Sequence, residues 1–437
     1  MSYPTRDSAT GAALPHWHDP SSRALEIVSG DGVRVTDADG TEHLDFISQL
    51  YCVNAGHGNE AIIRAMQDQL GDIQYVSPAK HNDARTTLAN RLTEIAPNEL
   101  SAVFFSISGS EANESAVQLA REYTGRPKVL TRWRSYHGST TGAGALTGDP
   151  ETRAPLEQYG GAPGTGKFLP PLPGAFDTAD PQELADRAVD HLRYVIRNEG
   201  PTSIAAILME PIGGTSGAYP PPADYLSRVR SLCRDHDILF IADEVITGFG
   251  RCGDWFGVDT EDIQPDLLTF AKAVTSAYSP LAGVLVRDDI AEQFRAEGYP
   301  LGQTFSGHPV ACAAGVAALE EYAGGLIENA RDLHNIFAEE LDKLADAHDV
   351  IHDVRGRGFL WGVEFADPSS GDPIVDPRTS DAANPVMDVI DAAADRGTII
   401  GRGRPPTQVL LAPPLTADAA TIKEGLTTLD DAIDVTF

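Results

Sequence analysis

Cysteine, lysine and long apolar segments are scarce in this sequence. Its four cysteines are far apart and form no CxxC pair, which argues against a disulfide framework or a zinc site and favours free thiols in a reducing compartment. No apolar run approaches the ~18 residues of a membrane span, and residues 1–19 lack the apolar core of a signal peptide. We therefore expect a soluble, cytoplasmic protein.

Positive charge is scarce as well. The 437-residue chain carries 64 acidic and 33 basic residues, a formal net charge of −31, and the acidic residues are dispersed along the sequence. This charge argues against nucleic acid or an anionic membrane as a partner. Together with the low lysine content it suggests a halophilic protein, because salt screens self-repulsion. An ordinary acidic cytoplasmic enzyme is the alternative.

One of only six lysines stands directly after an apolar run. Lys272 follows Leu267–Ala271, and Asp243 follows the apolar run Ile238–Ala242. Both runs are short, continuous and rich in Ile, Leu and Phe, which predicts strands buried on both faces. Open α/β folds bind ligands where neighbouring parallel strands end, so we expect the amine and the carboxylate to meet at such an edge.

An amine and an acid at one edge are what pyridoxal phosphate requires. The cofactor needs a lysine for its Schiff base and an acid beside its ring nitrogen. Lys272 and Asp243 can supply both groups, and Val245 would face the ring if the strand continues, because strand side chains alternate. A strand-end aspartate and a surface lysine are the simpler interpretation of either residue alone.

A second motif predicts an anion site. The apolar run Ala102–Ile107 predicts a strand, and Ser108-Gly109-Ser110-Glu111 leads from it into a helix that ends near Tyr123. A strand, a turn with glycine and a helix N-terminus together present free N–H groups to a phosphate. Ser108 and Glu111 also fit a capping box, which needs no ligand. Beside Asp243 and Lys272, we favour phosphate binding.

The segment Asp243–Arg251, followed by Phe270-Ala271-Lys272, resembles the class III aminotransferases, which are fold-type I pyridoxal-phosphate enzymes. The similarity runs from about residue 15 to the C-terminus. It implies an α/β fold in which a large domain, residues 61–309, contains a mainly parallel central sheet. A smaller α/β domain would combine residues 1–60 and 310–437.

The resemblance also implies roles around pyridoxal 5'-phosphate. Lys272 would be the catalytic residue, and Asp243 and Val245 would contact the ring. Gly109 and Ser110 would hold the phosphate.

Three further cofactor contacts follow from the same resemblance. Tyr136 would stack on the pyridine ring, and Glu210 would lie near the cofactor, where it can pair with a substrate-recognition arginine. Thr304 would reach the phosphate of a neighbouring subunit. Active sites would then be shared in an obligatory homodimer, or in a tetramer built from such dimers.

The predicted reaction is a ping-pong amino transfer from an ω-amino acid or amine to a keto acid. Relatives that use 2-oxoglutarate place an arginine before the paired prolines, where this chain has Leu410. Arg404 instead resembles the mobile arginine of amine:pyruvate aminotransferases, although Arg402 could serve, and Tyr51 would form a pocket wall. These residues favour pyruvate. The alternatives are a 2-oxoglutarate enzyme of the 4-aminobutyrate, ornithine or diaminobutyrate type, or a decarboxylase or aminomutase of the same fold.

Two other motifs look like ligand sites but are incomplete. The turn Asp37–Gly40, in a predicted antiparallel meander over residues 24–47, lacks the later ligands of a calcium loop, so no metal site is predicted. Residues 149–174 are rich in Gly and Pro and predict a long loop. They include Gly161–Phe168, which lacks the Ser or Thr that follows the lysine in a nucleotide-binding P-loop. An ATP- or GTP-hydrolysing protein is therefore a remote alternative.

Overall fold

The structure is a computed structural model that describes residue 16 and residues 25–437 except 98, 159, 162 and 377. Over these residues the strands of a central sheet run in the order β4-β10-β9-β8-β7-β5-β6, and all neighbours pair in parallel except β10, which is antiparallel to β4 and β9. The predicted α/β fold with a mainly parallel sheet is confirmed. The strands are β4 (Leu100–Ser106), β5 (Lys128–Arg132), β6 (Thr165–Phe168), β7 (Ile204–Met209), β8 (Leu239–Asp243), β9 (Leu267–Phe270) and β10 (Ala282–Arg287).

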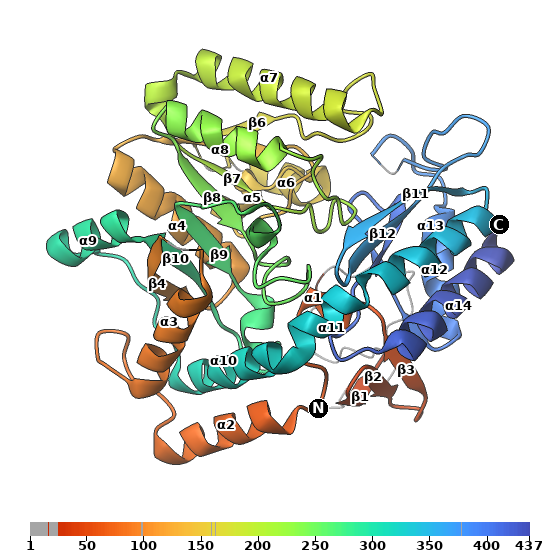
Figure 1. Cartoon of the computed structure of the whole chain (residues 1–437), viewed down its shortest axis with the longest axis horizontal. Coiled ribbons are helices and arrows are strands. Elements are labelled where there is room, and N and C mark those ends of the chain that lie inside the picture. Colours follow the sequence, from red (N-terminus) through yellow and green to blue (C-terminus); the bar gives the residue numbers. More distant parts are fainter. Residues whose placement is uncertain (1–15, 17–24, 98, 159, 162, 377) are drawn as a thin grey trace, which may run out of the picture.

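Helices cover both faces of this sheet, which explains why its middle strands are buried at every position and mostly apolar (Figure 1). Leu239 and Ile241 of β8 pack with residues of α4, whereas Phe240 and Ala242 belong to the cluster on the opposite face, with residues of α7 and α8. The helices and turns around the sheet are α2 (Glu60–Asp72), α3 (Asp83–Ile95), α4 (Gly109–Thr124), α5 (Thr141–Leu146), α6 (Pro150–Glu157), α7 (Pro181–Glu199), η1 (Pro201–Ser203), α8 (Tyr225–Asp235), η2 (Gly257–Glu261), η3 (Lys272–Thr275) and α9 (Asp288–Glu297).

The prediction of one long loop over residues 149–174 was wrong, because the segment contains helix α6 and strand β6. The side chain of Asp149 caps α6 by accepting a hydrogen bond from the Thr152 N–H at 3.1 Å. Pro150 occupies the first turn, where its missing N–H has no helical partner to lose. Proline therefore begins this helix, although its frequency suggested a loop.

The rest of the described chain forms two smaller sheets, which lie with α12, α13 and α14 on the right of Figure 1. One sheet has the order β1-β2-β3-β13 and joins the early strands, an antiparallel meander as predicted, to a late strand through a parallel β3–β13 pair. The other has the order β11-β12-β15-β14. Their strands are β1 (Ile27–Asp31), β2 (Arg34–Asp37), β3 (Glu42–Asp45), β11 (Ile351–Arg357), β12 (Leu360–Phe365), β13 (Thr398–Ile399), β14 (Gly401–Arg402) and β15 (Gln408–Leu411). The domain limits at residues 60 and 309 stay a prediction.

A long helical run connects the two parts. It comprises α10 (Pro309–Glu321), the π-helical turn η4 (Tyr322–Leu326), α11 (Ile327–Asp332) and α12 (His334–Ala347). By length and hydropathy this run could span a membrane, but 56% of its most apolar stretch is buried inside the protein, as in a core helix. The remaining helices are α1 (Ser48–Tyr51), α13 (Pro385–Asp395) and α14 (Ala419–Thr436).

A buried arginine ties distant segments together. The Arg251 guanidinium donates to the carbonyl oxygens of Phe359 and Pro413 and to the side-chain oxygens of Ser48 and Asn54. Arg251 is fully buried, and its partners come from both ends of the chain. It therefore holds these segments against the loop that follows β8.

Candidate active site

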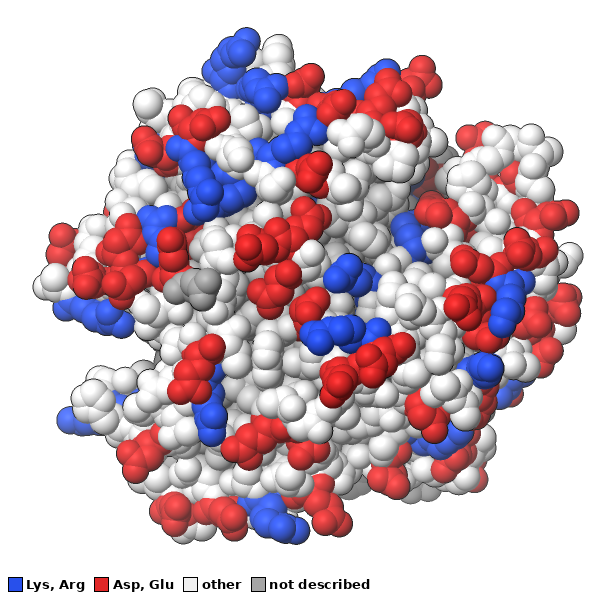
Figure 2. All heavy atoms as spheres, in the orientation of Figure 1, with Lys and Arg blue, Asp and Glu red and all other residues white. Residues whose placement is uncertain are grey.

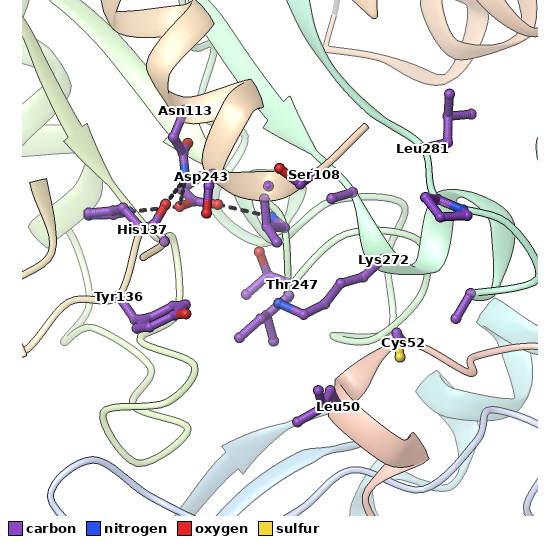
Figure 3. A pocket seen from close by; sticks show the side chains of 18 of the residues that line it. Leu50, Cys52, Ser108, Asn113, Tyr136, His137, Asp243, Thr247, Lys272 and Leu281 are labelled. Atoms are coloured by element: carbon purple, nitrogen blue, oxygen red, sulfur yellow. Dashed lines mark hydrogen bonds and ion pairs between the residues drawn. The ribbon is translucent and has the colours of Figure 1, made fainter. Parts of the chain in front are cut away.

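Asp243 and Lys272 lie at one edge of the central sheet. Asp243 ends β8 and pairs with Thr269 of the parallel strand β9, and Lys272 follows β9 after one residue. Both line a cavity of about 380 Å³, across which the Lys272 side chain extends toward Tyr136 and Thr247 (Figure 3). Seven of the ten predicted site residues line this cavity, namely Gly109, Ser110, Tyr136, Glu210, Asp243, Val245 and Lys272.

The Asp243 carboxylate receives several hydrogen bonds at the bottom of the cavity (Figure 3). Its Oδ2 accepts from His137 Nδ1 at 2.7 Å and from Asn113 Nδ2 at 2.8 Å, and its Oδ1 accepts from the Val245 N–H at 3.1 Å. Thr269 Oγ1 in turn donates to Asn113 Oδ1 at 2.8 Å. Burial raises the pKa of Asp243, but the hydrogen bonds outweigh it and hold the pKa below its ordinary value. Asp243 is therefore ionised.

His137 was left without a role by the sequence, yet it is the closest polar contact of Asp243. An ionised carboxylate can only accept, so His137 Nδ1 must carry the shared proton. Its Nε2 is buried and has no hydrogen-bond partner among the described residues. Asn113 and Thr269 were missed altogether. Helical spacing could have indicated Asn113, which lies four residues after Gly109 on α4 and so on the same face.

Burial shifts the protonation equilibrium of Lys272 toward the neutral amine. Burial lowers its pKa from the ordinary value, and the nearby Cys52 and Asp243 oppose this shift only in part. Its backbone φ is 47°, in the left-handed region that residues other than glycine rarely adopt. A lowered pKa increases the fraction of neutral amine, which is the nucleophilic and proton-accepting form.

The N-terminus of α4 forms another wall of the cavity. Ser108 caps the helix by accepting from the Glu111 N–H at 3.3 Å, and Gly109 and Ser110 occupy its first turn, where N–H groups have no helical acceptor. A Cβ added at Gly109 would lie 2.9 Å from Val245 Cγ1, too close for the present packing. Glycine at position 109 therefore lets Val245 pack against the helix start.

These groups fit pyridoxal phosphate. The free N–H groups and the positive end of the α4 dipole suit its phosphate, the ionised Asp243 suits its protonated ring nitrogen, and Lys272 suits its aldehyde carbon. Gly138 keeps the phosphate end open, because a Cβ there would lie 2.3 Å from Ser110 Oγ. The cavity residues therefore match the phosphate, the ring nitrogen and the aldehyde of the cofactor.

Glu210 lies at the cavity but is already paired. Its Oε2 lies 3.0 Å from Arg132 Nη2, its Oε1 accepts from the Tyr136 N–H at 3.0 Å, and both members of the ion pair are buried. The sequence had suggested a substrate-recognition arginine as partner. Arg132 belongs to β5 and does not line the cavity, so its guanidinium holds Glu210 and the Tyr136 backbone in place.

The other three predicted site residues lie outside the cavity lining. Tyr51 is buried in an apolar cluster with Leu410 and Ile212, and burial raises its pKa although Arg404 and Arg402 oppose the shift. The Arg404 guanidinium lies 5.3 Å from the ring centre of Tyr136, just behind the cavity wall. Thr304 is exposed in the loop before α10, where its carbonyl oxygen accepts from the Tyr75 hydroxyl at 3.0 Å. Its role stays a prediction.

The P-loop alternative was wrong. Lys167 lies on β6, where its Nζ donates to the carbonyl oxygens of Ala145 and Leu146 at 2.7 and 3.1 Å. A phosphate-binding lysine would need this amine free, and no helix begins after β6 within residues 169–180.

Comparison with known proteins agrees with the site geometry. The family model described as Aminotransferase class-III matches residues 15–433. The diaminobutyrate–2-oxoglutarate transaminase of Halomonas elongata is 34% identical over 432 residues, covering 93% of this chain and 90% of that one. The mitochondrial gamma-aminobutyrate transaminase 1 of Oryza sativa subsp. japonica is 35% identical over 375 residues, which cover 81% of this chain and 71% of that one.

Solved structures resemble the whole chain. The taurine:2-oxoglutarate aminotransferase of Bifidobacterium kashiwanohense, in complex with PLP and glutamate, superposes with a TM-score of 0.93 at 33% identity and covers 98% of this chain and 96% of that one. An amine transaminase from an uncultivated Pseudomonas species in its PLP-bound form gives a TM-score of 0.90 at 31% identity, covering 98% and 100%. Site geometry, family match and structural likeness lead to one conclusion: the chain belongs to the class III aminotransferases, which depend on pyridoxal phosphate.

Proposed function

We propose that this aminotransferase works in the cytoplasm and moves an amino group from an ω-amino acid or amine to pyruvate. The main support is Leu410, which is fully buried and packs with Tyr51, Ile212 and Ala412 in an apolar cluster. The resemblance places the arginine of 2-oxoglutarate enzymes at this position. Without it, the guanidinium of Arg404, which lies over the Tyr136 ring, remains as the candidate, and one guanidinium suits an acceptor with one carboxylate.

The residues of the cavity divide the work of the reaction. Bound pyridoxal phosphate supplies an electron sink for the negative charge that develops on the donor carbon. Lys272 Nζ holds the cofactor at rest and then moves a proton away from the donor carbon. Asp243 keeps the ring nitrogen protonated, and His137 and Asn113 keep Asp243 ionised and in place. Tyr136 and Val245 line the ring pocket and exclude water.

The acceptor can be identified with a panel of substrates. Purified enzyme is supplied with 4-aminobutyrate or n-butylamine as donor and with pyruvate or 2-oxoglutarate as acceptor, and alanine and glutamate are quantified. We expect kcat/KM for pyruvate to exceed that for 2-oxoglutarate by about tenfold or more, the effect of one charged hydrogen bond. A preference for 2-oxoglutarate would contradict the proposal and favour an acceptor like those in the names of two relatives. Transfer to neither acceptor would favour the decarboxylase or mutase reaction.

We further propose a homodimer, or a tetramer of dimers, with shared active sites. Phe305 and Leu301 are exposed apolar residues on either side of Thr304, and the Phe305 ring packs edge-on against Tyr75. Exposed apolar groups of this kind are typical of protein interfaces. Mixing Lys272→Ala with Thr304→Ala protein tests the arrangement. In a shared site one of the two hybrid sites carries both changes and the other carries neither, so the mixture regains activity over inactive Lys272→Ala homodimers.

The surface charge supports adaptation to salt. Acidic side chains are spread over the whole visible face, with basic ones between them (Figure 2). Salt screens the repulsion that a net charge of −31 produces. We propose that the melting temperature rises between low and molar salt, which calorimetry measures. An unchanged or lower melting temperature would favour an ordinary acidic enzyme.

A further inference from the structure

The Arg404 guanidinium is held by helix α6 in this structure. Its Nη1 lies 2.9 Å from Thr152 Oγ1 and 3.3 Å from Asp149 Oδ2, while the backbone N–H of Arg404 donates to the Thr215 carbonyl oxygen at 2.7 Å. Its other face lies over the ring of Tyr136, which lines the cavity. Arg404 therefore stands between the first turn of α6 and the substrate pocket.

Asp149, the partner of Arg404, is buried and held in place by several hydrogen bonds. It is 1% exposed, and its Oδ2 also accepts from the backbone N–H and the hydroxyl of Thr152 at 3.1 and 2.9 Å. Its backbone N–H donates to the Ser135 carbonyl oxygen at 3.0 Å, so the carboxylate cannot move far. Its Oδ1 is buried without a partner among the described residues. Within that same part of the chain, Arg404 is the cation in ion-pair contact with Asp149.

The contact leaves much of the guanidinium available. Within the described chain the guanidinium makes its hydrogen bonds through Nη1, whereas a guanidinium can bind a carboxylate through two nitrogens at once. A substrate carboxylate that reaches Arg404 would bind a guanidinium that is already paired with the Asp149 carboxylate. The two carboxylates then repel each other. A substrate without a carboxylate leaves the pair intact.

We propose that Asp149 is a positioning residue that sets the preference of the enzyme between carboxylate-bearing and neutral substrates, by competing with the substrate carboxylate for Arg404. This inference rests on the proposed function, because it takes Arg404 as the carboxylate-binding residue. In the wild type, Asp149 lowers the affinity for acids and neutralises Arg404 when a neutral amine is bound. Its removal strengthens acid binding and weakens neutral binding.

Equilibrium binding provides the decisive test. Propionate, an unreactive monocarboxylate of the size of pyruvate, is titrated into the holoenzyme by calorimetry. We expect Asp149→Asn to bind propionate roughly tenfold more tightly than the wild type, because the guanidinium has lost its anionic partner. The Arg404→Ala variant and the Asp149→Asn/Arg404→Ala double variant should bind propionate equally weakly. Kinetics should show the ratio of kcat/KM for 4-aminobutyrate over n-butylamine rising by a similar factor, through KM.

Two controls separate this effect from damage to helix α6. Asp149→Ser keeps an N-cap residue without a charge and should behave like Asp149→Asn. Glu151→Gln removes a charge from the same turn, one that lies 3.8 Å from Arg402, and should leave propionate affinity as in the wild type. The proposal is overturned if neither folded Asp149 variant binds propionate more tightly, or if Glu151→Gln alone does so. Failure of the proposed function would give a different result. The wild-type enzyme would then prefer 2-oxoglutarate over pyruvate, whatever the outcome of the propionate titrations.

Discussion

The cavity has two sides that are built in different ways. The cofactor side comprises Asp243, His137, Asn113 and Thr269, which are all buried, and its carboxylate receives hydrogen bonds from four residues. The proposed substrate side centres on Arg404, which lies behind Tyr136 in the loop between β14 and β15 and whose guanidinium makes its hydrogen bonds through one nitrogen, Nη1. The fold thus fixes Asp243 through several buried hydrogen bonds, whereas the guanidinium of Arg404, the proposed substrate-binding residue, is held by an ion pair and a hydrogen bond.

The largest expected effect concerns Lys272 on the edge of the cofactor side. Lys272→Ala should lower kcat by at least about 10³-fold, since no other described residue that lines the cavity carries an amine. Mass spectrometry after hydride reduction should find the cofactor on Lys272 in the wild type and on no lysine in the variant. The exposed Lys343→Ala serves as the control and should keep both the adduct and the activity. An adduct on another lysine of the wild type would refute the assignment.

The next effect concerns the support behind the cofactor side. Arg132→Met leaves Glu210 buried without its cation, which should lower the free energy of unfolding by about 3–5 kcal/mol. Urea denaturation of the holoenzyme measures it. Arg187→Met breaks an exposed ion pair with Glu183 on α7 and should leave the midpoint unchanged. Equal losses in both variants would mean that burial of the pair has no special consequence.

A third prediction contrasts two neighbouring acids. Hydrogen bonds keep Asp243 ionised, but burial raises the pKa of Glu244 from 4.5 to about 7, despite donors from Thr247, Gly257 and Val258. Between about pH 4.5 and pH 7 the folded chain therefore holds a proton that the unfolded chain releases. The contribution of Glu244 to the free energy of unfolding thus falls by about 3 kcal/mol as pH rises through this range. Glu244→Gln should lack this decline in urea titrations at pH 5 and 7.5. Parallel pH dependence in both proteins would contradict the shift.

The smallest effect should appear on the substrate side. Molar salt screens a partly exposed guanidinium, so the KM for pyruvate should rise about threefold between low and molar salt. The KM for n-butylamine should change little, because this donor carries no carboxylate. A larger salt effect on kcat than on the KM for pyruvate would place the salt-sensitive charges on the cofactor side. That result would contradict the contrast between the two sides.

The same contrast explains what the sequence could predict. Continuous apolar runs placed β8 and β9 side by side, and with them the ends that carry Asp243 and Lys272. The hydrogen-bond partners of Asp243 were harder to predict, because Asn113 lies on α4, Thr269 on β9 and His137 in the loop after β5, and these segments meet only after folding. For the same reason, sequence spacing could not predict that Glu210 pairs with Arg132 rather than with a substrate arginine. It could not predict the pairing of Arg404 with Asp149 either.

The parallel pair between β3 and β13 has a consequence for biosynthesis. Leu44 and Asp45 lie early in the sequence, yet their strand partners are Thr398 and Ile399. During translation, β3 leaves the ribosome first, and some 350 further residues must be synthesised before its partner strand β13 is available. The nascent polypeptide therefore carries an unpaired edge on β3 until synthesis is nearly finished, and such an edge can pair with other chains.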